Sequence, residues 1–191
     1  MRRRLDNGRR EELLDGVMEI ISARGFSEVK TAVIARELHC SESTLYKIAP
    51  NKDSLMVLAI GRWGEVTLEL LEERARGGKT PSERARLYFL GAAERLRPLS
   101  LAFRGDVERF ESTRMAYQVI ADRFVKRFVE LFDDAVAAGE IRPMNTQFLA
   151  EILRQIARLI RDEHILRASG LTSEQAALEV DGLIWDGIRL T

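Results

Sequence analysis

The stretch that decides the fold is Thr31–Lys52, TAVIARELHCSESTLYKIAPNK. Ile34 and Leu38 lie four residues apart and share one helical face, and Leu45 and Ile48 lie three apart and share another. Between these two patterns, the segment HCSE is too short for a third element and long enough for a tight turn. The pattern predicts a helix-turn-helix over residues 31–50.

The second helix of this pair would turn five polar side chains away from its apolar face: Glu42, Ser43, Thr44, Tyr46 and Lys47. All five can hydrogen-bond, and a helix of this kind fits the major groove of DNA. Two short helices joined by a tight turn also occur in all-α proteins that do not bind DNA, so the spacing alone leaves both interpretations open.

The N-terminal ten residues contain five arginines against one acidic residue, Asp6. Arg2, Arg3 and Arg4 therefore form a basic arm that can seek phosphates, although a merely solvated terminus has the same composition. Over the whole chain of 191 residues, 30 basic and 30 acidic side chains cancel, so the net charge points to no polyanionic partner.

The single cysteine, Cys40, excludes an intramolecular disulfide and a cysteine-cluster metal site. No apolar run approaches the length of a membrane span, and the charged N-terminus is followed by no apolar segment. We therefore expect a cytoplasmic protein that contacts no membrane and carries no metal and no cofactor.

Helical periodicity continues through the rest of the chain, and no segment alternates with period two. The sequence predicts an all-α protein of about nine helices: a three-helix head in residues 1–52 and a larger bundle in residues 53–191. Thr31, Asn51, Thr80 and Thr172 are expected caps at helix starts, and residues 98–109 are expected to be irregular.

The final two expected helices are apolar on more than one face, which favours pairing with a second copy of the chain. The alternative is that one of them is the buried centre of the bundle. The candidate dimer residues are Ile152, Ile156, Leu159, Ile160, Leu183, Ile184 and Ile188.

From Arg9 to Leu58 the chain resembles the TetR family of transcriptional regulators. The resemblance is carried by LLDGVMEIISARGF at 13–26 and by TAVIARELHCSESTLYKIAPNKDSL at 31–55. Its most specific part is TLY at 44–46 followed by P-x-K at 50–52. Beyond Trp63 the similarity is architectural only.

The resemblance implies a homodimer that binds a pseudo-palindromic double-stranded DNA operator and usually represses. It also implies that a small apolar or amphipathic effector in the larger domain releases the DNA. By position in the family's motif, Thr31 and Lys52 would contact the phosphate backbone, and Arg2 to Arg4 would form the arm. The residues Glu42, Ser43, Thr44, Tyr46 and Lys47 would read bases and adjoining phosphates.

Three positions depart from the family's usual pattern. His39 stands where glycine is common in the turn, and histidine tolerates positive φ better than most residues. Ser43 replaces a common glycine and could add a polar contact. Ile48 and Ala49 replace a frequent aromatic pair, which removes a phosphate-directed group at that end of the helix.

The expected effector site lies among aromatic and aliphatic side chains of the bundle, any of which could equally be ordinary core: Trp63, Tyr88, Phe89, Leu96, Phe103, Phe110, Tyr117, Ile120, Phe124 and Phe128. Four arginines around residues 95–109 could meet an anionic ligand or simply be solvated: Arg95, Arg97, Arg104 and Arg109.

Two rival functions are weaker. An enzyme is not expected, because His39 and His164 lie far apart and no nucleophile, metal or phosphate-loop motif occurs. A helical dimeric adaptor that does not bind DNA remains the main alternative.

Overall fold

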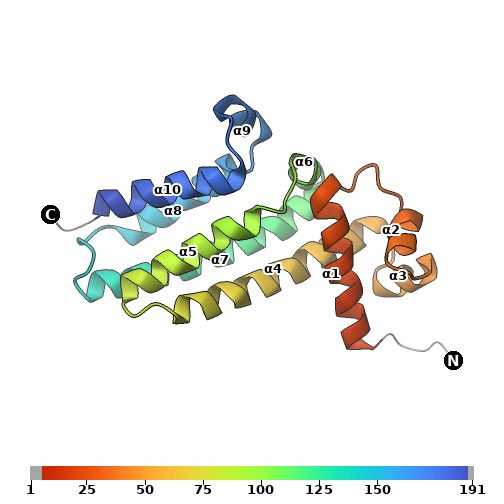
Figure 1. Cartoon of the computed structure of the whole chain (residues 1–191), viewed down its shortest axis with the longest axis horizontal. Coiled ribbons are helices and arrows are strands. Elements are labelled where there is room, and N and C mark those ends of the chain that lie inside the picture. The colour runs from red at the N-terminus through yellow and green to blue at the C-terminus, as the bar shows by residue number, and fades with distance from the viewer. Residues whose placement is uncertain (1–5, 189–191) are drawn as a thin grey trace. The chain divides into compact units, whose positions relative to one another are not determined.

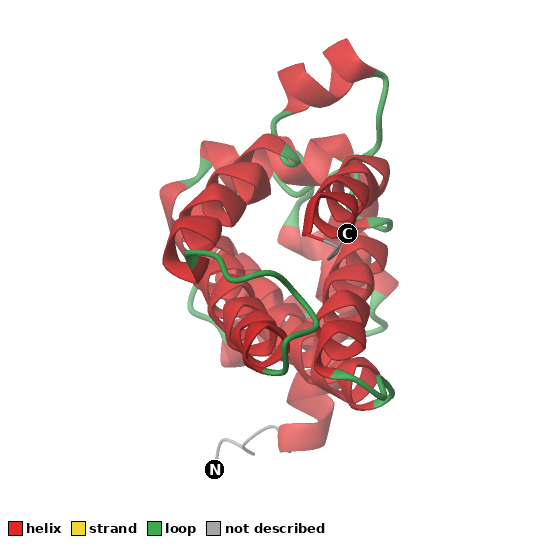
Figure 2. Ribbon diagram, turned by 90° about the vertical axis from the view of Figure 1, so that its left-hand side faces the viewer, coloured by secondary structure: helices red, strands yellow, loops and turns green. Residues whose placement is uncertain are grey.

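The computed structural model describes residues 6–188, and all regular secondary structure in that range is helical, with ten helices and no strand (Figure 2). The all-α prediction is confirmed, and the count of about nine helices falls one short. None of these ten helices combines the length and apolar character needed to cross a membrane.

The described residues form two compact units. Residues 6–65 and 98–118 make the first unit, and residues 66–97 and 119–188 make the second. Residues 98–118, which the sequence placed in the bundle, thus pack with the head. Two long helices contribute residues to both units, α4 (Lys52–Arg76) and α7 (Glu111–Ala137).

The first unit is built around the helix-turn-helix. Beside the first part of α4 and the start of α7 it contains four further helices (Figure 1): α1 (Asn7–Arg24), α2 (Thr31–Glu37), α3 (Glu42–Ile48) and α6 (Leu101–Arg109). Helix α1 packs on α6, and α2 packs on α3. Apolar residues of α1 belong to the core of this unit, since Leu13, Leu14, Val17 and Ile21 are each at most 2% exposed.

The second unit is a helical bundle. It contains the remainder of α4 and α7 with α5 (Pro81–Leu96), α8 (Thr146–Leu159), α9 (Glu163–Ser169) and α10 (Ser173–Ile188). Helix α5 packs against α10. The core of this unit includes Phe128, Phe132 and Val125 of α7, all fully buried.

Three of the predicted helix starts are confirmed in atomic detail. The Asn51 side chain accepts a hydrogen bond from Ser54 N at 2.8 Å, and Thr80 Oγ1 accepts one from Glu83 N at 3.3 Å. Thr172 forms a reciprocal capping box, because Gln175 N donates to its Oγ1 at 3.1 Å and Thr172 N donates to the Gln175 amide oxygen at 2.8 Å.

Three sequence expectations about helix ends were wrong or incomplete. Thr31 does not cap α2, because the capping position is Lys30, whose carbonyl accepts from Val33 N and Ile34 N. Residues 98–109 are not irregular: Ser100 Oγ accepts from Phe103 N at 3.1 Å and restarts a helix, α6, directly after Pro98. Helix α9, capped by Asp162, was not predicted.

Candidate functional site

The helix-turn-helix is anchored by side chains that are almost completely buried. Ile34 of α2 is 0% exposed, Leu45 of α3 is 1% exposed, and Ala35 is 2% exposed. Between the helices, Cys40 N donates to Ala35 O at 2.9 Å, and His39 adopts φ +51°. The turn therefore uses the left-handed conformation that the sequence predicted for His39.

Cys40 lies half-buried in this turn. Burial raises the pKa of its thiol above the usual range, and the positive charge of Arg9 opposes that shift. The thiol is consequently protonated near neutral pH, which argues against a reactive thiolate at this position.

The N-terminal end of α3 carries a small network of hydroxyl groups. Ser41 caps the helix by accepting from Thr44 N at 3.2 Å, and its Oγ lies 2.8 Å from Ser43 Oγ and 2.9 Å from Thr44 Oγ1. The predicted contact residues Ser43 and Thr44 are thus held by Ser41. Ser43 is exposed and Thr44 half-buried, so each can still meet a partner from outside.

The other three predicted reading residues point away from the core. Glu42, Tyr46 and Lys47 are exposed, and Tyr46 keeps 49% of its surface accessible. Since Leu45 between them is buried, α3 presents one apolar anchoring face and one polar face. Side chains on such a polar face can reach base edges without any change in the fold.

The predicted phosphate-contacting residues differ in exposure. Thr31 is the first residue of α2 and is only 9% exposed. Lys52 Nζ donates to Ser27 O at 3.0 Å, so this lysine also holds the segment between α1 and α2. Arg2, Arg3 and Arg4 lie outside the described residues.

A buried carboxylate joins α6 to the segment that precedes the helix-turn-helix. Asp106 is 8% exposed, and its Oδ2 accepts hydrogen bonds from Phe26 N at 2.5 Å and Ser27 N at 2.8 Å. At Gly25, φ is +79° and an added Cβ would lie 2.6 Å from that oxygen and 3.1 Å from the backbone of Ala102. Asp106 lies 80 residues beyond Phe26, so no local sequence pattern predicts this contact.

Four of the predicted effector residues lie in the first unit. Phe103 and Phe110 pack around Phe26, with ring centroids 6.2 and 5.8 Å from it, and Trp63 stacks on Tyr117 at 5.8 Å. Phe103 and Phe110 therefore pack on the segment that precedes the helix-turn-helix.

The other predicted effector residues lie in the second unit, where the aromatic rings form a continuous series. Tyr88 stacks on Phe124 at 5.3 Å, Phe124 on Phe128 at 6.1 Å, and Phe89 lies within 6.1 Å of both phenylalanines. Burial and, secondarily, the negative charge of Glu72 raise the pKa of the Tyr88 hydroxyl, which therefore remains neutral. Leu96 and Phe124 are half-buried, and Ile120 is 8% exposed.

The arginines around residues 95–109 have intramolecular partners. Arg104 is buried and donates to Leu99 O at 2.8 and 2.9 Å, and Arg97 pairs with Glu174. Arg95 donates to Thr67 Oγ1 at 3.2 Å, and the guanidinium of Arg109 lies 5.8 Å from the Phe110 ring centroid. Each of the four therefore already contacts another residue of the chain.

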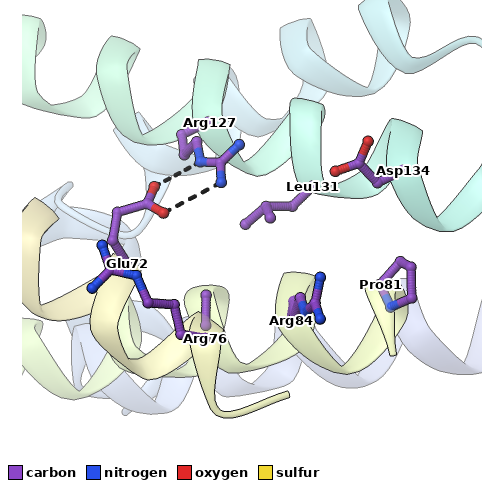
Figure 3. A pocket seen from close by; sticks show the side chains of 8 residues that line it. Glu72, Arg76, Pro81, Arg84, Arg127, Leu131 and Asp134 are labelled. Atoms are coloured by element: carbon purple, nitrogen blue, oxygen red, sulfur yellow. Dashed lines mark hydrogen bonds and ion pairs between the residues drawn. The ribbon is translucent and has the colours of Figure 1, made fainter. Parts of the chain in front are cut away.

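A pocket of about 510 Å³ opens in the second unit between the end of α4, the start of α5 and α7 (Figure 3). It is lined by Glu72, Ala75, Arg76, Pro81, Arg84, Arg127, Leu131 and Asp134. Its lining is mainly polar, and none of these residues was among the predicted effector contacts. Three helices supply the lining residues, which lie up to 62 positions apart in the sequence. No short sequence motif therefore predicts this pocket.

The candidate dimer residues lie on α8, on α10 and in the turn that follows α8. Leu183 is 76% exposed, Leu159 49% and Ile152 40%, whereas Ile156, Ile160 and Ile184 are half-buried. Phe148, which the helical spacing predicts to point inward, is instead 66% exposed and adds an aromatic ring to the surface of α8. The side chain of Ile188 lies outside the described part of the chain.

Comparison with known proteins gives the following likenesses. Residues 13–59 match the family model for bacterial regulatory proteins of the tetR family. The chain is 28% identical over 185 residues to the HTH-type transcriptional repressor KstR of Mycobacterium tuberculosis, covering 95% of this chain and 80% of that protein. It is also 28% identical to KstR of Mycolicibacterium smegmatis, over 95% of this chain and 86% of the relative.

Two solved structures share the fold. A transcriptional regulator from Saccharomonospora viridis, crystallised with choline, superposes with a TM-score of 0.74 at 16% identity, covering 97% of this chain and 100% of the other. A TetR-family regulator from Rhodococcus sp. gives a TM-score of 0.71 at 19% identity, with coverages of 92% and 96%.

Proposed function

The chain is a TetR-family transcriptional regulator, and from this premise we propose that it represses transcription as a homodimer whose α2–α3 pair binds a pseudo-palindromic operator. A small molecule bound in the second unit releases the DNA. The observation that carries the proposal is α3, which is anchored by buried Leu45 and turns Glu42, Tyr46 and Lys47 outward. The repressor names of the two KstR relatives support repression over activation.

Pairing of two copies through α8 and α10 would suit a pseudo-palindromic operator. Leu159 and Leu183 leave large apolar surfaces exposed, and a second copy of the same helices would cover them. In a two-fold dimer, the two α3 helices enter successive major grooves about 34–36 Å apart. A conformer with a different separation binds the operator less well.

Release follows from differential affinity. An effector shifts the dimer away from DNA only if it binds the non-operator conformer more tightly. The chain passes from one unit to the other within α4, within α7 and between Arg97 and Pro98, so these are the covalent connections through which the second unit can influence the first.

Two lysines test the DNA-reading role. Lys47→Ala should lower affinity for the selected operator by about 1–3 kcal/mol and change sequence preference, because Lys47 lies on the exposed face of α3. Lys52→Ala should weaken all DNA sequences alike and reduce the salt slope by about one unit. Both are measured by fluorescence anisotropy on selected genomic fragments and on random duplex, across a salt series.

The matched control is Lys126→Ala, which removes one positive charge from an exposed position on α7. Because Lys52 also bonds to Ser27 O, urea unfolding of Lys52→Ala separates lost stability from lost phosphate contact. If no genomic fragment binds better than random duplex at near-physiological salt, the regulator proposal fails and the dimeric adaptor takes its place.

A further inference from the structure

The pocket of the second unit holds charges that its own residues only partly balance. Arg127 is committed, because its Nε and Nη2 donate to Glu72 at 2.6 and 3.3 Å and its Nη1 donates to Glu130 at 3.2 Å. This pair neutralises Glu72, as the dashed lines of Figure 3 show. Among the lining residues, Arg76 and Arg84 then remain against Asp134, and outside the lining Glu140 lies close enough to Arg84 for their charges to interact.

Arg84 is held in place by the turn that precedes α5. Its Nε donates to Gly78 O at 3.1 Å, and a Cβ at position 78 would lie 2.7 Å from Arg84 N and 2.9 Å from Arg84 Cγ. Only glycine therefore allows the turn to lie so close to this side chain. The Nη atoms of Arg84 make no hydrogen bond to the described residues, and a guanidinium held at Nε can still offer them to an oxyanion.

The side chain of Arg76, at the end of α4, makes no hydrogen bond or ion pair within residues 6–188, and it lines the same pocket. The nearby carboxylate of Glu140, outside the lining, accepts from Ser82 N at 2.9 Å. Two guanidinium groups from different helices thus border one hollow, and fork-shaped donors of this kind match a carboxylate.

The rest of the lining is apolar. Ala75, Pro81 and Leu131 come from α4, α5 and α7, and Leu131 is 4% exposed and belongs to the core of the unit. A volume of about 510 Å³ lies within the usual range of small-molecule sites. A ligand with one acidic group and a short apolar part would satisfy both kinds of surface.

We propose that this pocket binds an amphipathic organic monoanion, a carboxylate with a short apolar tail, through Arg76 and Arg84, and that such an anion is the effector. The second half of this statement rests on the proposed repressor function. Asp134 disfavours polyanions, because a second negative charge in the pocket would face its carboxylate (Figure 3).

Binding is tested with probes that share a tail and differ in the head group. Octanoate, octanol and octylammonium, each below its aggregation concentration, and inorganic phosphate are titrated into the full-length chain by calorimetry. We expect octanoate to bind at least about tenfold more tightly than octanol, and octylammonium and phosphate to give no saturable heat. Equal binding of octanoate and octanol, or no binding of octanoate, overturns the proposal.

Variants place the binding at this pocket. Arg76→Gln and Arg84→Gln should each weaken octanoate by about tenfold, and Lys126→Gln on the exposed face of α7 should leave it unchanged. Circular dichroism and thermal unfolding show whether Arg84→Gln disturbs the turn. If it does, Arg76→Gln alone tests whether octanoate binds in this pocket. Unchanged octanoate affinity in Arg76→Gln refutes the site.

The effector role has a separate readout. Octanoate should lower operator affinity of the wild-type chain, whereas Arg76→Gln should bind the operator like wild type and respond about tenfold less to octanoate. If octanoate binds specifically but does not change operator affinity, the effector role is refuted and the binding-site half of the proposal stands. If the protein binds no DNA fragment selectively, the repressor function is refuted. Calorimetry then still shows independently whether octanoate binds in the pocket.

Discussion

The helix-turn-helix and the polar pocket show two ways in which a sequence produces a candidate binding surface. The first is made from consecutive residues, so that each outward side chain of α3 has an inward anchor such as Leu45 close by in the chain. The second is lined by residues between positions 72 and 134 on three helices, so side chains far apart in the sequence border one pocket. A surface of the first kind can be read locally, whereas a surface of the second kind exists only after folding.

Buried carboxylates give the same contrast at atomic scale. In the first unit, Asp106 accepts two backbone hydrogen bonds from a segment 79–80 residues away. In the second unit, Asp181 is equally buried, but its Oδ2 meets exposed Arg86 and its Oδ1 has no hydrogen bond among the described residues. The two aspartates therefore differ in what their removal leaves behind.

The largest expected effect comes from removing the carboxylate of Asp106. Asp106→Ala strands the N–H groups of Phe26 and Ser27 and should lower the free energy of unfolding by about 3 kcal/mol. Asp181→Ala removes one ion pair to a half-exposed arginine and should cost within about 1 kcal/mol. Urea unfolding followed by circular dichroism measures both.

Asp106→Asn provides the conservative control, since its amide oxygen can still accept from both N–H groups. It should recover most of the stability lost in Asp106→Ala. Equal destabilisation by Asp106→Ala and Asp181→Ala would show that the hydrogen bonds of Asp106 add no stability beyond that of a buried aspartate. It would contradict the proposed difference between the two aspartates.

The part of the fold that the sequence predicted was the part governed by nearby residues. Capping by Asn51, Thr80 and Thr172 needs only a side chain and an N–H three residues on, and all three were confirmed. The positive φ of His39 follows from a turn between two helical patterns and was also confirmed.

The missed features depend on tertiary structure or on weak local signals. Helix α6 follows Pro98 so closely that the proline concealed the capping role of Ser100. Asp106 acts on Phe26 across 80 residues, and the pocket arginines converge only when α4, α5 and α7 pack together. The roles of the predicted DNA, effector and dimer residues remain predictions, because they concern partners.

An intermediate effect is expected at helix caps, where each unit offers a matched position. Ser41 accepts from Thr44 N at 3.2 Å at the start of α3, and Asn145 accepts from Phe148 N at 2.9 Å at the start of α8. Ser41→Ala and Asn145→Ala should each cost about 1 kcal/mol in the free energy of unfolding.

The two cap variants should differ in their affinity for the operator. Ser41→Ala also frees the Ser43 and Thr44 hydroxyls, so operator affinity should fall more than stability alone explains, whereas Asn145→Ala should leave it near wild type once the protein is folded. Anisotropy titrations at a temperature where both variants are fully folded make the comparison. An equal loss of operator affinity in both would contradict a direct role for the start of α3.

The smallest expected effect lies in two turns that share a backbone conformation. His39 has φ +51° in the first unit and Gly139 has φ +72° in the second, and a Cβ at Gly139 would meet no atom within 4 Å. His39→Gly should therefore raise the free energy of unfolding by about 0.5 kcal/mol, and Gly139→Ala should lower it by a similar amount, since left-handed strain outweighs the chain entropy of glycine. Thermal unfolding of the two single variants and the double variant measures the shifts, which should cancel in the double. Destabilisation by His39→Gly would mean that the exposed histidine side chain makes a favourable interaction in the turn, and the helix-turn-helix would then depend on more than its backbone and its buried anchors.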